Sequence, residues 1–122
     1  MKVLVKLMAS AAMLSAALAS PLAAAHATLK SSDPQSGATL AAAPKAIALT
    51  FNEKIEEAFT SVTLTDAAGN ASTTGKPKVD TENPAVVRAD IGPLRSGTYT
   101  VQWAVAGHDG HRRTGSFSFT VK

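Results

Sequence analysis

Hydrophobic residues recur at every second position in four stretches of this chain, and this spacing constrains the fold more than any other feature. They alternate with small or polar residues, and the stretches span residues 47–51, 62–64, 99–105 and 117–121. A period of two places one set of side chains on a buried face and the other set in water, as in the strands of a half-exposed sheet. We find no long segment with helical spacing. The alternation therefore predicts an all-β fold.

Turn-forming residues separate these stretches, and further elements are expected between them. Less regular apolar residues at 86–91 predict another strand, and residues 28–32 can form a short first strand. Residues 71–82 are polar and are expected to form an irregular loop or a weak edge strand. Residues 54–60 can form one helical turn, because Ile55 and Phe59 are four positions apart. Together these elements predict an Ig-like Greek-key β-sandwich or barrel of about seven antiparallel strands.

Two aromatic residues fit the interior of such a sandwich. In the segment LRSGTY, Tyr99 is placed as in a tyrosine corner, where the tyrosine hydroxyl bonds a nearby backbone group. Trp103 lies in the alternating stretch that follows and is expected to fill the core between the sheets. We therefore assign both residues to the fold rather than to a binding site.

The first 25 residues have the layout of a secretory signal peptide. Lys2 and Lys6 form a basic start, an apolar stretch covers residues 7–19, and small alanines precede His26. The apolar stretch is shorter than the ~20 residues that a membrane-spanning helix needs. We therefore expect cleavage just before His26. Residues 1–25 would be removed, and residues 26–122 would form one exported domain.

Charge and sulfur content exclude several classes of function for this domain. Without the two lysines of the signal peptide, ten of the 12 basic residues remain against 9 acidic ones, so no basic patch for nucleic acid is expected. The chain has no cysteine, and its three methionines all lie within residues 1–13. Cu(I) and other soft metals prefer thiolate or thioether ligands. A metal bound by residues 26–122 must therefore have nitrogen and oxygen ligands.

His26 would be the first residue of the mature domain, where a histidine is an unusual chelator. Its free α-amine and its ring Nδ1 can both bind one metal ion, so that one residue supplies two nitrogen ligands. A second histidine and a carboxylate would complete a tetragonal site of the kind that Cu(II) prefers. The amine must lose its proton to bind, so binding releases protons. His26 is therefore the first candidate ligand for Cu(II).

The segment GHDGH, residues 107–111, contains the other two histidines of the chain. In an extended chain, residues two apart point to the same face, so Asp109 and His111 can aim at one ion. His108 would then point away, unless the glycines bend the chain and make His108 an alternative ligand. Glu53 follows an expected strand. It is either an ordinary surface carboxylate, or a group that steadies His26 from outside the ligand set or binds the metal weakly in the axial position.

A family resemblance is found at both ends of the predicted domain, in the segments HATLKSSDPQSGATLAAAPKAIALTFNE and SGTYTVQWAVAGHDGHRRTGSFSFTV. Both resemble CopC-type periplasmic copper-binding proteins. The resemblance implies a seven-stranded Greek-key sandwich. It implies a Cu(II) site made by the amine and ring of His26, the imidazole of His111 and the carboxylate of Asp109, with Glu53 nearby. It also implies a role in copper resistance, storage or delivery to an inner-membrane importer of the CopD type.

The chain departs from this family pattern in two places. Some members bind Cu(I) in a methionine-rich loop that this chain lacks, so we expect a variant that binds Cu(II) only. His108 is not required by the simplest family pattern and stays an alternative ligand. Because one chain supplies every expected ligand, we also expect a monomer.

Two other functions remain open on the sequence. An Ig-like structural module of bacterial surface proteins would have similar strands and no metal, but it would not explain His26 or the segment GHDGH. Lytic polysaccharide monooxygenases also hold copper through an N-terminal histidine on a sandwich fold. Such an enzyme needs an open coordination position and a flat surface with exposed aromatics, whereas most aromatics here lie in alternating strand patterns. We therefore expect copper binding without enzymatic activity.

Overall fold

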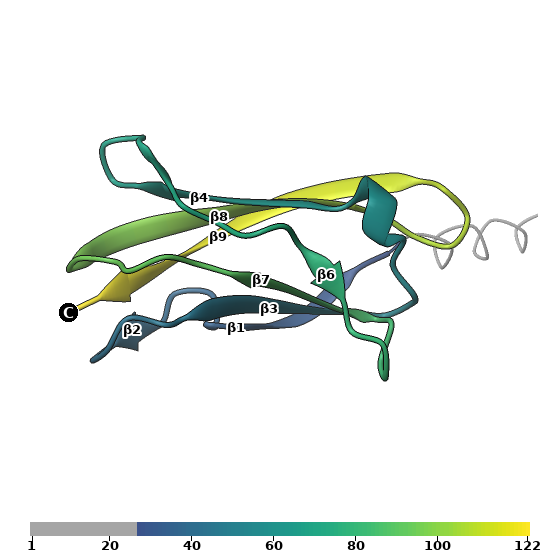
Figure 1. Cartoon of the computed structure of the whole chain (residues 1–122), viewed down its shortest axis with the longest axis horizontal. Coiled ribbons are helices and arrows are strands. Elements are labelled where there is room, and N and C mark those ends of the chain that lie inside the picture. Colours follow the sequence, from purple (N-terminus) through teal and green to yellow (C-terminus); the bar gives the residue numbers. More distant parts are fainter. Residues whose placement is uncertain (1–26) are drawn as a thin grey trace, which may run out of the picture.

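The computed structural model describes residues 27–122, which form two β-sheets packed face to face (Figure 1). Its elements are β1 (Leu29–Asp33), β2 (Thr39–Leu40), β3 (Ala46–Phe51), the 3-10 helix η3 (Glu57–Phe59), β4 (Ser61–Asp66), β5 (Ala71–Ser72), β6 (Lys78–Val79), β7 (Val86–Asp90), β8 (Gly97–Ala106) and β9 (Arg112–Val121). One sheet has the strand order β1-β3-β7-β6, and the other has the order β2-β9-β8-β4-β5. The predicted all-β sandwich is confirmed.

The strand count and one pairing differ from the prediction of about seven antiparallel strands. The described residues contain nine strands, of which β2, β5 and β6 are only two residues long. Strand β2 pairs with β9 in parallel, while the other strand pairs are antiparallel. The polar segment 71–82 forms β5 and β6, which are the weak edge strands that its composition predicts. Short polar segments pair for two residues because they offer little apolar surface to bury.

The alternating residues of the sequence form the core between the sheets. In β3 the side chains of Ile47, Leu49 and Phe51 are buried, and the residues between them are partly exposed. The same pattern holds in β9 from Phe117 to Val121. The core cluster is Ala27, Ile47, Leu49, Phe51, Ile55, Val62, Leu64, Val87, Ala89, Tyr99, Val101, Trp103, Val105, Phe117, Phe119 and Val121. Trp103 belongs to this cluster, as predicted.

The helical turn predicted for residues 54–60 is present but packs differently. It is the three-residue 3-10 helix η3, and Ile55 lies before it in a bridge with Gly107. Ile55 is buried, whereas Phe59 is 59% exposed, so the two side chains do not form one apolar face. The predicted helical turn is therefore confirmed over three residues only, and Ile55 lies outside it, so the four-residue spacing does not place the two side chains on one helix face. The part of the chain that the structure describes contains no helix long and apolar enough to cross a membrane.

The tyrosine corner is confirmed and gives a first testable prediction. The Tyr99 hydroxyl donates a hydrogen bond to the backbone carbonyl of Arg95, with an O···O distance of 2.8 Å. Replacing Tyr99 by Phe removes this bond and leaves the carbonyl of Arg95 without that donor. We expect Tyr99→Phe to lower the free energy of unfolding by about 1 kcal/mol in urea denaturation. An unchanged midpoint and slope would contradict a structural role for the hydroxyl.

Candidate metal centre

Segments from three parts of the sequence meet at one end of the sandwich. The start of β1, the bend after β3 and the loop between β8 and β9 all lie there, at the right in Figure 1. Thr28 and Asn52 are joined by two hydrogen bonds, described below, and Ile55 bridges Gly107. This end therefore combines the first described residues with the loop that contains His108, Asp109 and His111.

The loop 107–111 is a tight turn and not an extended strand. The Gly110 amide donates to the Gly107 carbonyl at 2.9 Å, and the Gly107 amide donates to the His111 carbonyl at 3.3 Å. Gly110 has a φ of +85°, a left-handed conformation that favours glycine. The segment is therefore bent at its glycines, which is the alternative to an extended conformation that the sequence leaves open.

The turn nevertheless brings Asp109 and His111 together. The ring Nδ1 of His111 lies 2.8 Å from Oδ2 of Asp109, and the His111 amide donates to Oδ1 at 3.1 Å. The side chains are 63% exposed for His111 and 32% exposed for Asp109, so both are accessible from solvent. A carboxylate bonded to one ring nitrogen fixes the orientation of an imidazole, and a metal then binds the other ring nitrogen. Direct binding of the metal by Asp109 stays a prediction.

Glu53 contacts the backbone of the same loop. Its Oε1 accepts a hydrogen bond from the His108 amide at 3.3 Å. A Cβ atom on Gly107 would lie 2.7 Å from this oxygen, so the carboxylate packs directly over the glycine. Glu53 is half-buried and holds the loop, which is more than an ordinary surface carboxylate would do. Its predicted role beside the metal stays a prediction.

The remaining candidates are placed less completely. His108 is exposed, and the contact that the structure gives it is the one from its backbone amide to Glu53. His26 lies outside the described residues. Within residues 27–122, no group of three or more His, Cys, Asp or Glu side chains could hold a metal ion. The contact between His111 and Asp109 thus provides one nitrogen and one oxygen donor group, and a complete site needs further ligands.

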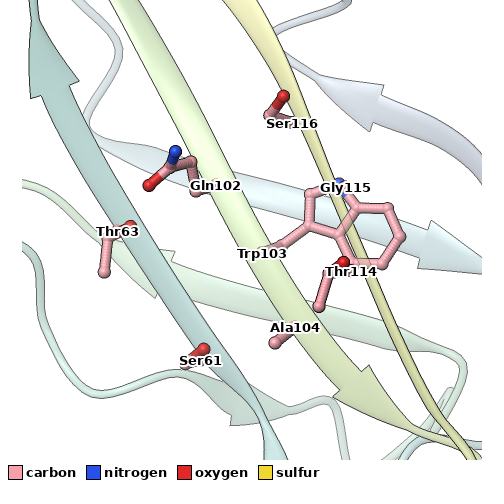
Figure 2. Close-up of a pocket in the computed structure, with 8 residues that line it drawn as sticks. All are labelled: Ser61, Thr63, Gln102, Trp103, Ala104, Thr114, Gly115 and Ser116. Atoms are coloured by element: carbon pink, nitrogen blue, oxygen red, sulfur yellow. The ribbon is translucent and has the colours of Figure 1, made fainter.

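A separate hollow lies on the five-stranded sheet, over β4, β8 and β9 (Figure 2). Its lining is Ser61, Thr63, Gln102, Trp103, Ala104, Thr114, Gly115 and Ser116. The hydroxyl and amide side chains belong to the face turned away from the core, while the Trp103 indole lies against β9 at Gly115. This hollow has no carboxylate or imidazole in its lining, so its donor set does not suit a copper ion.

Comparisons with known proteins point to one family. A family profile described as "CopC domain" matches residues 29–122. The chain is 36% identical over 117 residues to "Copper resistance protein C" of Pseudomonas syringae pv. tomato, covering 86% of this chain and 87% of that protein. It is 34% identical over 112 residues to "Protein YobA" of Escherichia coli (strain K12), covering 91% and 90%.

A solved structure agrees with these sequence matches. The crystal structure of CopC from Methylosinus trichosporium OB3b is similar to this fold, with a TM-score of 0.76 and 30% sequence identity. The match covers 80% of this chain and 94% of that one. Both the sequence and the sandwich therefore match the same family over most of the described chain.

Proposed function

This chain belongs to the CopC family of copper resistance proteins, and on that premise we propose that it binds one Cu(II) ion through His26, Asp109 and His111. The observation that carries the proposal is the 2.8 Å contact between the His111 ring and the Asp109 carboxylate. It lies in the loop that Glu53 anchors, and Glu53 is next to Asn52, which bonds Thr28 near the start of the domain. The His26 amine and ring would supply two further nitrogen ligands.

The choice of Cu(II) rests on the ligands that the domain can offer. Imidazole, amine and carboxylate groups suit tetragonal Cu(II), which has the highest affinity in the divalent series. Residues 26–122 contain neither cysteine nor methionine, because the three methionines precede residue 14. Soft thiolate and thioether ligands for Cu(I) are therefore missing from this domain. We propose a variant that binds Cu(II) only.

Export is needed to produce the proposed ligand. CopC family proteins are periplasmic, and we propose that residues 1–25 are the signal peptide that directs this chain there. Cleavage before His26 would create the free α-amine, so the site would be complete only after export. The bound copper would be held for resistance or storage, or passed to an inner-membrane importer of the CopD type, by a monomeric domain.

Family membership also decides between the alternatives. CopC proteins bind copper without enzymatic activity, so this chain is a copper-binding resistance protein and not a monooxygenase. Membership of this copper-binding family also argues against the alternative of a metal-free Ig-like module.

The test of the proposed site compares two histidines of one loop. We expect His111→Ala to weaken Cu(II) binding at least about 100-fold, because even outer groups of metal sites cost about 10–100-fold when removed. His108→Ala is the matched control and should change the affinity less than about twofold, since its ring is outside the proposed ligand set. Affinity is measured by competition with a chelator of known strength. Equal binding by His111→Ala and the unchanged protein would refute the site.

A further inference from the structure

We propose that Asn52 is a positioning residue for copper binding, which holds the start of the domain beside the loop of Asp109 and His111. This inference rests on the proposed function, because it concerns how the N-terminal ligands reach the site. Asn52 contributes no metal ligand. It would act through the backbone of residue 28, two positions after His26.

Asn52 and Thr28 exchange two hydrogen bonds. The Thr28 amide donates to the Asn52 side-chain Oδ1 at 2.7 Å, and the Asn52 amide donates to the Thr28 carbonyl at 3.0 Å. The two residues are 24 positions apart in sequence. They lie just beyond the last pair of the β1–β3 ladder, Leu29 with Phe51. The Asn52 side chain therefore continues the pairing of β1 past the end of the regular strand.

The neighbouring residues make this connection stiff. Ala27 is 1% exposed and belongs to the hydrophobic core, so the chain is fixed immediately after residue 26. Phe51, just before Asn52, is also buried and packs edge-on against Trp103, with ring centroids 5.2 Å apart. The bend at residue 52 thus extends from a rigid part of the sandwich.

Glu53 makes the second half of the connection. It bonds the His108 amide and packs over Gly107, while its neighbour Asn52 holds Thr28. Two adjacent residues therefore contact both sources of the proposed ligands, the N-terminal segment and the loop. We name this pair, Asn52 and Glu53, the ligand brace.

The ligand brace would lower the free-energy cost of ordering the two segments when copper binds. A metal that takes ligands from two separate segments must order both of them, and affinity rises when the segments are already held in place. Without the Asn52 side chain, the Thr28 amide loses its acceptor, and the first residues of the domain gain freedom that copper binding must remove. Binding through the His26 amine would weaken, while binding through His111 alone would not change.

The experiment is a cycle of four proteins titrated with Cu(II). Asn52→Ala is made in the form that begins at His26 and in a form with one glycine before His26, which lacks the chelating amine. We expect Asn52→Ala to weaken binding about 10-fold in the first form, as for other groups that orient metal ligands. In the extended form it should change binding less than about twofold. Asn70→Ala, in the β4–β5 turn at the opposite end of the sandwich (Figure 1), is the control.

Further variants separate positioning from general stability. Asn52→Asp keeps the Oδ1 acceptor and should restore most of the affinity. If Asn52→Ala folds poorly, Asn52→Leu takes its place, because leucine keeps the side-chain size without an acceptor. We expect the same loss of affinity from Asn52→Leu. Amide exchange at Thr28 should speed up in both variants that lack the acceptor.

The outcomes separate failure of the brace from failure of the proposed function. If Asn52→Ala weakens both forms equally, or neither, Asn52 does not position the N-terminus and the inference is overturned. If the unchanged domain binds Cu(II) equally with and without the added glycine, the N-terminal chelate itself fails, and the positioning role falls with it. That second result is read from the two proteins that contain Asn52, so the two failures cannot be confused.

Discussion

A form of the protein with one glycine before His26 is expected to bind Cu(II) about 1,000-fold more weakly than the form that begins at His26. The glycine turns the amine into a peptide nitrogen and so removes one ligand and the chelate ring with it. Loss of an outer group already costs about 10–100-fold, and chelation adds to this because the second bond forms within one residue. Electron paramagnetic resonance should show a nitrogen-rich tetragonal Cu(II) spectrum for the form that begins at His26. The extended form should give a spectrum with fewer nitrogen ligands. Competition with a chelator gives the affinities.

The control for this experiment adds the same glycine elsewhere. Lys122 is exposed at the opposite end of the sandwich (Figure 1), and a glycine after it should leave Cu(II) binding unchanged. If the N-terminal extension also leaves binding unchanged, the copper site does not use the amine. The ligands would then come from the loop of His108 and His111. If neither form binds Cu(II), the proposed function fails.

The fold could be predicted because the burial pattern of a strand depends on residues that are close together in the sequence. Each alternating stretch, such as the one from Ile47 to Phe51, specifies by itself which side chains face the core. The tyrosine corner has a local signature as well, since Tyr99 bonds a carbonyl only four residues earlier. These features need no knowledge of the rest of the chain. The parallel pairing of β2 with β9 has no local signature, because it joins residues 81 positions apart, such as Thr39 and Thr120.

The candidate site could be predicted in its residue types but not in its geometry. The spacing of Asp109 and His111 predicts that both can aim at one ion, and the structure brings their side chains together. The turn that does so depends on hydrogen bonds that the Gly107 and Gly110 amides donate. The sequence leaves open whether this segment is extended or bent at its glycines, so it does not fix the geometry. The role of Asn52 was missed altogether. Its partner Thr28 is distant in sequence, and a lone asparagine after a strand is typical of an ordinary turn.

The packing of Trp103 against β9 depends on a residue without a side chain. A Cβ atom on Gly115 would clash with Cζ2 of the indole and would lie 2.7 Å from Cε2. The indole is confined on another side by Phe51, whose ring meets it at an interplanar angle of 75°. Trp103 and Gly115 are also direct partners in the β8–β9 ladder. The rigid indole therefore has little room to move away from an added methyl group.

We accordingly expect Gly115→Ala to lower the free energy of unfolding by about 3 kcal/mol, the upper end of the usual cost of overpacking a core. Chemical denaturation measures this, with Gly75→Ala as the matched control. A Cβ atom at Gly75 would be 3.5 Å from its nearest neighbour, an ordinary contact, so that variant should stay within about 0.5 kcal/mol of the unchanged protein.

A second substitution shows whether the indole is the cause of this loss. If Trp103 opposes the new methyl group, Trp103→Phe combined with Gly115→Ala should cost less than the sum of the two single changes. If the two losses of stability simply add, the cost of Gly115→Ala comes from the backbone at residue 115 and not from contact with the indole. The distinction bears on the copper site, because Trp103 supports Phe51, and Phe51 precedes Asn52 and Glu53. A displaced indole should therefore also weaken Cu(II) binding in the form that begins at His26, which ties the packing of the core to the placement of the ligands.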